Sequence, residues 1–406
     1  MSTKSPGVPP AQAYLGLADA WKFSRGEGQK VAVIDTGVNR HPRLPNLEPG
    51  GDYVSTDDGT VDCDGHGTVV AGLIAGQPSP EDGFSGVAPA AQIMAIRQTT
   101  QYFREKGAAP KDPNNPTIGN FGDINTLASA IRHAADAGAT VINISEVACG
   151  PPTLYDPSVG AAVQYAVQVK NVVVVVAAGN DDNKDCLGNT GIDPLNPAAD
   201  PWDNVKAAVS PAWYDRYGLV LAVGSVDLNG QPSKFTIPGP WVGVAAPGED
   251  IVSLDPNSSG LTNQFQGRNG QPNSLRGTSF AAPYVAGVAA LVRARFPELS
   301  AQEVIERIQA TAHRPPDGWN PWLGFGIVDP VAALTHQVDP NIQLVKKPTS
   351  LVNRSTQLPV PATPPPPDHT ARNVALIGTG IVAVLVILGY LASFPVRRML
   401  GVRENE

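Results

Sequence analysis

Ser279 stands at the start of RGTSFAAPYVAGVAALVRARF, residues 276–296. The apolar residues in this stretch are so dense that they predict a helix covered on nearly every face. A serine at the entrance of such a helix can do one of two things. Its hydroxyl can cap the unpaired N–H groups of the first turn, or it can act as a nucleophile. The second role requires a histidine that removes its proton and a group that orients the histidine.

A histidine and an aspartate stand in suitable places. His66 lies between two glycines in DCDGHGTVVAGLIAG, residues 62–76, directly before another apolar helical stretch. Asp35 closes the apolar run VAVID, residues 31–35, and the carboxyl ends of buried strands are where ligand sites gather in α/β sheets. Each residue also has an ordinary interpretation. An isolated histidine often only caps or packs, and an aspartate after a strand often forms a turn.

Asn180 supplies a fourth polar group, at the end of VVVVVAAGN, residues 172–180. An amide N–H held at a strand end can stabilise the oxyanion that forms when a hydroxyl attacks a carbonyl. The alternative is an asparagine in a turn after Gly179. Together, Asp35, His66, Asn180 and Ser279 are the groups that acyl transfer needs, and this chemistry requires neither a metal nor an organic cofactor.

Short apolar runs rich in β-branched residues predict the elements that position these groups. They are apolar throughout, which is typical of strands covered on both faces. Helical spacing occurs between and after them, and Ser300 with Glu303 forms a capping-box pattern before the last helix. This alternation predicts an α/β fold with a mainly parallel central sheet and helices on both faces. The predicted strands are 31–35, 92–98, 140–145, 171–179, 219–226 and 241–248, and the predicted helices include 125–139, 160–170 and 300–312.

Four segments carry a resemblance to a known family. VAVIDTGV, DGHGTVVAGLIAG, VVVVAAGN and GTSFAAPYVAGVAALV each resemble the matching segment of the subtilisin-like serine proteases, over about residues 20–335. The resemblance implies the three-layer subtilisin-like fold and a serine endopeptidase that cleaves proteins or peptides. It implies that Asp35 orients His66, that His66 is the base for Ser279, and that Asn180 and the Ser279 N–H form the oxyanion hole.

A finer resemblance is to the mycosins, the membrane-anchored subtilisin-like proteases of actinobacterial type VII secretion systems. It rests on AWKFSRGEGQKVAVIDTGV, the cysteine in DCDGHGT, NISEVAC, FTIPGPWVGVAAPGEDIVSL and a proline-rich linker before an apolar C-terminal stretch. The resemblance implies a protease domain on the extracytoplasmic side, association with the secretion membrane complex, and a disulfide between Cys63 and Cys149. It also implies an alternative role, a scaffold subunit that stabilises the complex independently of proteolysis.

The chain departs from the family pattern in two places, and a group of aspartates raises the separate question of calcium. SEVACG, residues 145–150, stands where many subtilisins have an SLGG-like segment beside the substrate, so the cleavage specificity is not predicted. Cys186 has no predicted partner. The aspartates at 181, 182 and 185 could suggest calcium, but a solvated loop is the preferred interpretation because no carbonyl-rich cage can be identified from the sequence.

The C-terminal end has the composition of a membrane anchor. No charged residue occurs from Asn373 to Val396, and about 22 helical residues span roughly 33 Å, the thickness of a bilayer core. A buried core helix is the alternative. Arginines at 397, 398 and 403 favour a cytoplasmic tail. We therefore predict an N-terminal extension (1–19), a protease domain (20–336), a proline-rich linker (337–372), one transmembrane helix (373–394) and a short basic tail (395–406).

The overall composition narrows the functional classes further. The net charge of −8 argues against nucleic acid as a main partner. The three cysteines lack the spacing of a zinc site, and one disulfide plus one thiol would suit a compartment outside the cytosol. The N-terminal stretch has no apolar run of signal-peptide length, and we favour a missing signal sequence over another export route. Long polar insertions at 99–123 and 181–218 are expected to be functional or mobile loops.

Overall fold

The computed structural model divides the chain into two units, residues 1–354 and 355–406, and each is described by itself. The described residues are 7–102, 122, 124–154, 156–181, 184–191, 199–266, 271–339, 342, 344, 346 and 370–399. Most of the predicted insertion at 99–123 and most of the predicted linker therefore lie outside the described residues, as do Asp182 and the last residues of the predicted tail.

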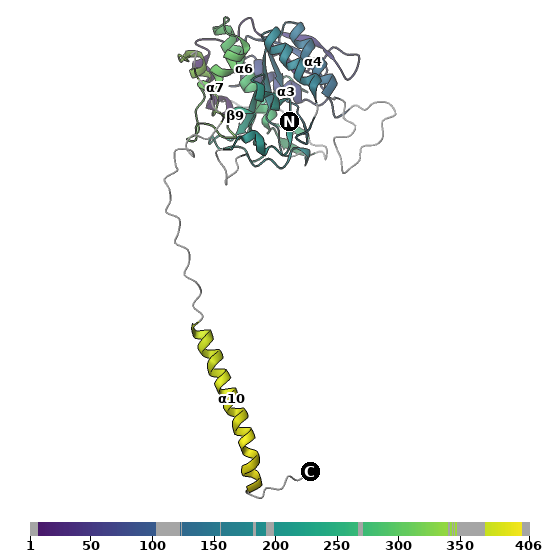
Figure 1. Cartoon of the computed structure of the whole chain (residues 1–406). Coiled ribbons are helices and arrows are strands. Elements are labelled where there is room, and N and C mark those ends of the chain that lie inside the picture. Colours follow the sequence, from purple (N-terminus) through teal and green to yellow (C-terminus); the bar gives the residue numbers. More distant parts are fainter. Residues whose placement is uncertain are drawn as a thin grey trace. The chain divides into compact units, whose positions relative to one another are not determined.

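A seven-stranded sheet, parallel throughout, forms the centre of the first unit (Figure 1). All six predicted runs are strands of this sheet, which confirms the predicted fold class. The strands are β1 (Lys30–Asp35), β2 (Leu47–Asp52), β3 (Gln92–Arg97), β4 (Val141–Ile144), β6 (Val173–Ala177), β8 (Leu221–Val226) and β9 (Val242–Pro247), in the spatial order β2-β3-β1-β4-β6-β8-β9.

The strand β2 was not predicted. Its sequence, LEPGGD, contains a proline and two glycines, which weaken a strand pattern. It lies at the edge of the sheet and is only partly buried, so it lacks the apolar run that marks the interior strands. An edge position tolerates the missing N–H of Pro49, because that side of the strand needs no ladder partner.

The position of β1 in the sheet determines where a site can form. β1 pairs with β3 on one side and with β4 on the other, so the chain order reverses at this strand. In sheets of this kind, the loops on the two sides of such a switch point diverge, and ligands usually bind there. Asp35 is the last residue of β1 and thus stands at this switch point.

Helices flank the sheet. α3 (His66–Ala75) packs against α6 (Thr278–Arg295), which lies along β4, β6, β8 and β9. α4 (Ile124–Asp136) packs against α5 (Pro157–Gln164) and contacts β1, β3 and β4. α7 (Ala301–Ala310) begins with the predicted capping box of Ser300 and Glu303. The predicted burial of α6 is confirmed, since every residue from Phe280 to Val292 is buried.

Shorter elements complete the first unit. A π-helical turn, η1 (Tyr165–Val169), extends α5, and α8 (Pro330–Thr335) closes the unit. The 3₁₀ turns are η2 (Lys184–Cys186), η3 (Pro201–Asn204) and η4 (Ala212–Tyr217). Three two-stranded ladders pair β5 (Ala148–Gly150) with β7 (Ala208–Ser210), β10 (Ser253–Leu254) with β11 (Leu261–Thr262), and β12 (Gln264–Gln266) with β13 (Pro272–Ser274).

The described part of the N-terminal extension packs on the same body. It forms two short helices, α1 (Pro10–Tyr14) and α2 (Leu17–Ala20), so the predicted boundary after residue 19 falls within α2. The Gln12 side chain exchanges two hydrogen bonds with the backbone of Ser85, and the Trp21 indole donates to the Val87 carbonyl at 2.8 Å. These contacts tie the extension to the loop that follows α3.

The expected disulfide between Cys63 and Cys149 is wrong. Cys149 is bonded to Cys186, and Cys63 is an exposed free thiol. Cys149 lies in β5, against which the turn η2 packs, and this brings the Cα atoms of Cys149 and Cys186 to 5.0 Å, within the range a disulfide requires. The pairing thus depends on the path of the loop between β6 and β7, which no local sequence pattern reports.

This pairing has a measurable consequence. A Cys186→Ser substitution is expected to lower the free energy of unfolding by about 4 kcal/mol, because the bond closes a loop of 37 residues in the unfolded chain. Cys63→Ser is the matched control and should change it by less than about 0.5 kcal/mol, since the thiol is exposed. Urea unfolding of the three proteins under non-reducing conditions compares them, and equal losses from both substitutions would contradict the observed pairing.

The described part of the second unit is one helix, α10 (Thr370–Met399). Residues 372–392 form a segment of mean hydropathy 2.5 that is not buried against other described residues. Its exposed side chains include Leu376, Ile381, Leu385 and Leu388. By length and composition this helix could cross a bilayer, and it contains the predicted transmembrane segment 373–394.

Candidate active site

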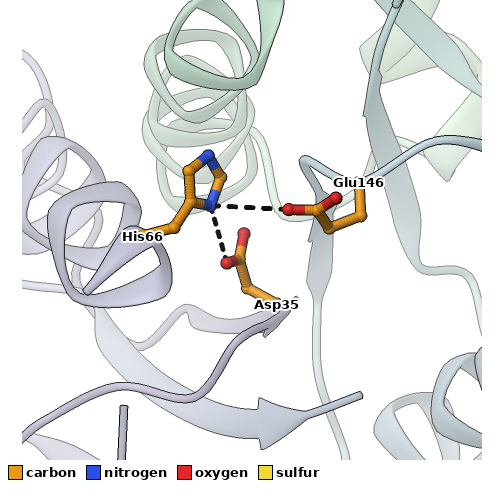
Figure 2. A group of neighbouring side chains, drawn as sticks. All are labelled: Asp35, His66 and Glu146. Carbon is orange, nitrogen blue, oxygen red and sulfur yellow. Dashed lines mark hydrogen bonds and ion pairs between the residues drawn. The ribbon is translucent and has the colours of Figure 1, made fainter. Parts of the chain in front are cut away.

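Asp35 and His66 meet at the carboxyl end of β1 (Figure 2). The Nδ1 atom of His66 lies 2.7 Å from Oδ1 of Asp35, a charge-assisted hydrogen-bond distance. Asp35 is fully buried, whereas His66 is partly exposed. The second ring nitrogen of His66 points away from the carboxylate and is left for another partner (Figure 2). Asp35 thus fixes the imidazole through Nδ1, and the ring remains partly exposed to solvent.

The close approach of α3 to the loop after β1 makes this contact possible. Gly67, the second residue of α3, packs directly on the Gly37 backbone, and a Cβ atom at this position would overlap the Gly37 carbonyl oxygen. Its backbone N–H donates to Oγ1 of Thr36 at 3.0 Å. A residue with a side chain at position 67 would push the start of α3, and His66 with it, away from Asp35.

Asp62 joins the two segments that carry Asp35 and His66. Its carboxylate is buried and accepts hydrogen bonds from the Thr36 hydroxyl at 2.8 Å, from Gly65 N–H at 2.7 Å, and from the backbone and hydroxyl of Thr68 at 2.8 and 2.6 Å. Burial raises the pKa of Asp62 to about 6, although the hydrogen bonds from Thr68 and Thr36 oppose this shift. Asp62 is therefore a positioning group that acts through Thr36 and the first turn of α3.

The electrostatic setting of His66 favours its protonated form. Burial alone would lower the pKa of the imidazole, because a charged ring is poorly solvated there. The charge of Asp35 and its hydrogen bond outweigh this effect, and Glu146 and Asp62 add to them, so the pKa rises to about 9. The surroundings are thus arranged to stabilise an imidazolium.

Ser279 is the second residue of α6 and is partly exposed. It is not a helix cap: the N-cap residue is Gly277, and no side chain caps this terminus. The carbonyl of Ser279 accepts a hydrogen bond from Oγ of Ser145 at 2.9 Å, and the ring of Phe280 lies 5.1 Å from the ring of His66, centroid to centroid. The start of α6 therefore lies close to His66, although the two are far apart in the sequence.

Asn180 is held rigidly beside the same helix start. Its Oδ1 atom accepts from the backbone N–H of Thr278 at 3.0 Å and from the Thr278 hydroxyl at 2.9 Å, and that hydroxyl accepts from Gly179 N–H at 3.2 Å. Because Oδ1 is occupied by two donors, the amide is fixed in one orientation, with its Nδ2 donor on the other side.

The place between Asn180 and Ser279 is kept open by Gly277. A Cβ atom on Gly277 would lie 3.0 Å from Oγ of Ser279 and 3.2 Å from Nδ2 of Asn180, so both polar atoms surround one point. The residue has a φ of 147°, which side-chain-bearing residues rarely adopt. An oxygen atom that developed charge near this point would lie within reach of the Asn180 donor.

The structure thus gathers all four predicted site residues around the ends of β1 and β6 and the starts of α3 and α6. It also reveals polar groups that the sequence did not single out, namely Thr36, Asp62, Ser145, Glu146 and Thr278. Of these, Ser145 and Glu146 had a local signal, since both stand in the segment that departs from the SLGG-like pattern. The others are small polar residues whose partners lie far away in the chain.

Among the described residues, one cluster of three acidic or histidine side chains has the spacing of a metal site, Asp35, His66 and Glu146. Asp35 already occupies Nδ1 of His66, with a hydrogen bond that needs a proton between the two atoms. A proton-transfer site fits this arrangement better than a ligand set. Such an arrangement can remove a proton from a neighbouring hydroxyl and stabilise the resulting positive charge on the ring.

Comparisons with known proteins agree with this geometry. Residues 26–326 match the family model described as the subtilase family, Peptidase_S8. Mycosin-4 of Mycobacterium tuberculosis (strain ATCC 25618 / H37Rv) is 47% identical over 391 residues, covering 94% of this chain and 81% of that protein. The structure of MycP1 from the ESX-1 type VII secretion system superposes with a TM-score of 0.75 at 47% identity, covering 85% of this chain and 92% of that one. A chain of an intact ESX-5 inner membrane complex matches with a TM-score of 0.75 at 42% identity and covers 98% of this chain and 94% of its own length.

Proposed function

The chain belongs to the subtilase family and, within it, to the mycosins, and from this premise we propose how its active site works. It is a subtilisin-like serine protease, and we propose that Asp35, His66 and Ser279 are its catalytic residues. The observation that carries this proposal is the 2.7 Å contact between His66 and the buried Asp35, together with the ring of Phe280, the residue after Ser279, at 5.1 Å from the imidazole.

In the proposed reaction, His66 takes the hydroxyl proton of Ser279 while the oxygen attacks the carbonyl carbon of a peptide bond. The imidazolium that forms is stabilised by Asp35, which also holds the ring in the tautomer that leaves Nε2 free to accept. His66 then gives the proton to the departing amine, and water repeats the sequence on the acyl-enzyme. The raised pKa of His66 is consistent with an environment that stabilises this cation.

We assign the oxyanion to the space that Gly277 leaves open. Nδ2 of Asn180 and the backbone N–H of Ser279 are its donors in this proposal, and the Thr278 contacts keep the amide from rotating. The N-terminus of α6 adds favourable potential at the same place, because its first N–H groups point out of an 18-residue helix. No step requires a metal or an organic cofactor.

We further propose that α10 crosses the cytoplasmic membrane with the protease domain outside and the basic tail inside. The length and hydropathy of α10 and the arginines after it support this orientation. Because a relative of 42% identity is part of an ESX-5 inner membrane complex, we propose that this chain also associates with a type VII secretion membrane complex. Proteins exported by that system are then its substrates.

The alternative role of a scaffold without proteolysis has less support, since the chain matches the subtilase family and is 47% identical to a mycosin. The two roles are nevertheless separable by one substitution. Ser279→Ala removes the nucleophile and leaves α6 intact, so it should abolish cleavage without affecting any contact made through the membrane helix.

One experiment tests both parts of the proposal. Solubilised membranes that contain the full chain are treated with a fluorophosphonate probe, and mass spectrometry locates the label. We expect labelling at Ser279, no labelling of Ser279→Ala, and co-purification of both proteins with the secretion complex. A folded wild-type chain that takes no label would contradict the proposed catalytic site, and separation of both proteins from the complex would contradict the proposed association.

A further inference from the structure

Glu146 lies beside the proposed active site, but the proposed reaction does not use it. It is the second residue after β4, which pairs with β1 in the sheet, so its segment runs next to the one that carries Asp35. Its Oε1 atom lies 3.9 Å from Nδ1 of His66 (Figure 2). The segment is anchored, because Ser145 accepts a hydrogen bond from Asn143 and donates one to the Ser279 carbonyl, each at 2.9 Å.

Glu146 does not hold the His66 ring in the way that Asp35 does. A distance of 3.9 Å is too long for a hydrogen bond, and Asp35 already holds Nδ1 of His66 at 2.7 Å. The two carboxylates also differ in exposure, since the Asp35 side chain is fully buried and that of Glu146 is 44% exposed. Glu146 therefore places a negative charge at the solvent-facing rim of the site, where an incoming peptide can meet it.

The surroundings of this charge suit a long basic side chain. Phe280 and Phe265 flank His66, at 5.1 and 6.2 Å from its ring, and lie 5.9 Å from each other, centroid to centroid. Phe280 is buried, whereas Phe265 is partly exposed, so Phe265 offers the aromatic surface here. Such a surface can accommodate the methylene stem of lysine or arginine, while the charged end stays near a carboxylate and water. An acidic side chain in the same place would be repelled.

The direction of Glu146 from His66 indicates which side of the scissile bond it serves. In the proposed mechanism Nε2 of His66 delivers the proton to the departing amine, whereas Glu146 lies by Nδ1, the opposite edge of the ring. We propose that Glu146 is a specificity-determining residue that selects peptides with a lysine or arginine in the two positions on the acyl side of the scissile bond. This inference rests on the proposed serine-protease site.

The same charge has a second, independently measurable effect. The charged groups acting on His66 are Asp35 from β1, Asp62 from the loop before α3 and Glu146 after β4, while α6 and β12 present the phenylalanine rings. All three carboxylates favour the protonated imidazole, which cannot accept the Ser279 proton. Neutralising Glu146 should therefore lower the pKa of His66 and move the acidic limb of the rate profile to lower pH.

The test uses full-length wild-type protein, Glu146→Gln and a matched control, Glu298→Gln. Gln keeps the shape of the side chain and removes its charge, and Glu298 is an exposed residue beyond the far end of α6, about 25 Å from Ser279 along the helix. The probes are peptidyl diphenyl phosphonates that differ only in lysine, norleucine or glutamate at the first or second residue before the phosphorus. Rates of Ser279 modification are measured between pH 6 and pH 10.

We expect the wild type to react faster with the lysine probes than with the glutamate probes at one of these positions. Glu146→Gln should reduce this ratio by about fivefold, the upper range for a partly exposed ion pair, and shift the acidic limb down by about half a pH unit. Glu298→Gln should leave both unchanged. An unaltered lysine-to-glutamate ratio in Glu146→Gln would overturn the proposal.

A binding measurement separates this proposal from the catalytic one. If no probe modifies Ser279 in the wild type, the proposed catalytic site is rejected. The specificity role of Glu146 is then tested by peptide binding alone. The corresponding peptide amides are titrated against Ser279→Ala and against Ser279→Ala with Glu146→Gln. A preference for lysine that disappears with Glu146→Gln supports a specificity role, and equal affinities for the lysine and glutamate peptides in both proteins reject it.

Discussion

His66→Ala is expected to lower kcat/KM for a fluorogenic peptide by at least about 10²–10⁴-fold, because it removes the group that we propose accepts the Ser279 proton. The loss should fall mainly on kcat, since the imidazole acts on the reacting atoms rather than on the rest of the peptide. Steady-state kinetics at pH 9 measure it. His133→Ala, on the exposed side of α4, is the matched control and should keep full activity. A His66→Ala protein that retains activity would remove His66 from the mechanism.

The dependence of the rate on pH is expected to follow the protonation of His66. Below its pKa of about 9 His66 is increasingly protonated and cannot act as a base, so the rate should rise with pH and level off above that value. Asp35→Asn removes the strongest influence that raises the pKa, and burial then lowers it. The residual activity of Asp35→Asn should therefore have its acidic limb at lower pH, and an unshifted limb would show that Asp35 does not control the imidazole.

Asn180→Ala is expected to lower kcat by about 10²–10³-fold with little change in KM. This is the range known for removing one oxyanion donor from a protease of the subtilisin type, and it arises because the donor acts mainly on charge that develops in the transition state. The Asn180 amide is held by Thr278 with its donor toward the space beside Gly277. Kinetics of the purified full chain with the same peptide measure the effect.

Thr278→Val provides a graded companion to this experiment. Valine keeps the size of the residue and the backbone N–H bond to Asn180, but removes the hydroxyl, which donates to Asn180 at 2.9 Å and accepts from Gly179 N–H at 3.2 Å. The amide should lose part of its orientation, so kcat should fall by less than in Asn180→Ala, by about tenfold for a bond of this strength. A Thr278→Val protein as impaired as Asn180→Ala would indicate a general disturbance of α6 instead.

Local patterns in the sequence determined much of this protein. The six predicted strands are runs of apolar residues, and α6 is apolar on all faces, so their burial could be predicted without knowing their neighbours. Asp35, His66, Asn180 and Ser279 each stand at the end of such an element, but each has an ordinary interpretation alone, and their joint resemblance to the subtilisin-like pattern made them site candidates. The apolar stretch at 373–394 is likewise a property of composition alone.

Only the tertiary structure decided which distant groups meet. The bond of Cys149 to Cys186 depends on how η2 packs on β5, and the approach of Glu146 to His66 depends on β4 pairing with β1. The contacts of Asp62 with Thr36 and of Thr278 with Asn180 join segments whose own patterns predict nothing about each other. Short stretches of sequence determine which apolar residues are buried. Hydrogen bonds and disulfides, in contrast, need two groups within a few ångströms of each other, and only the packed fold sets these distances.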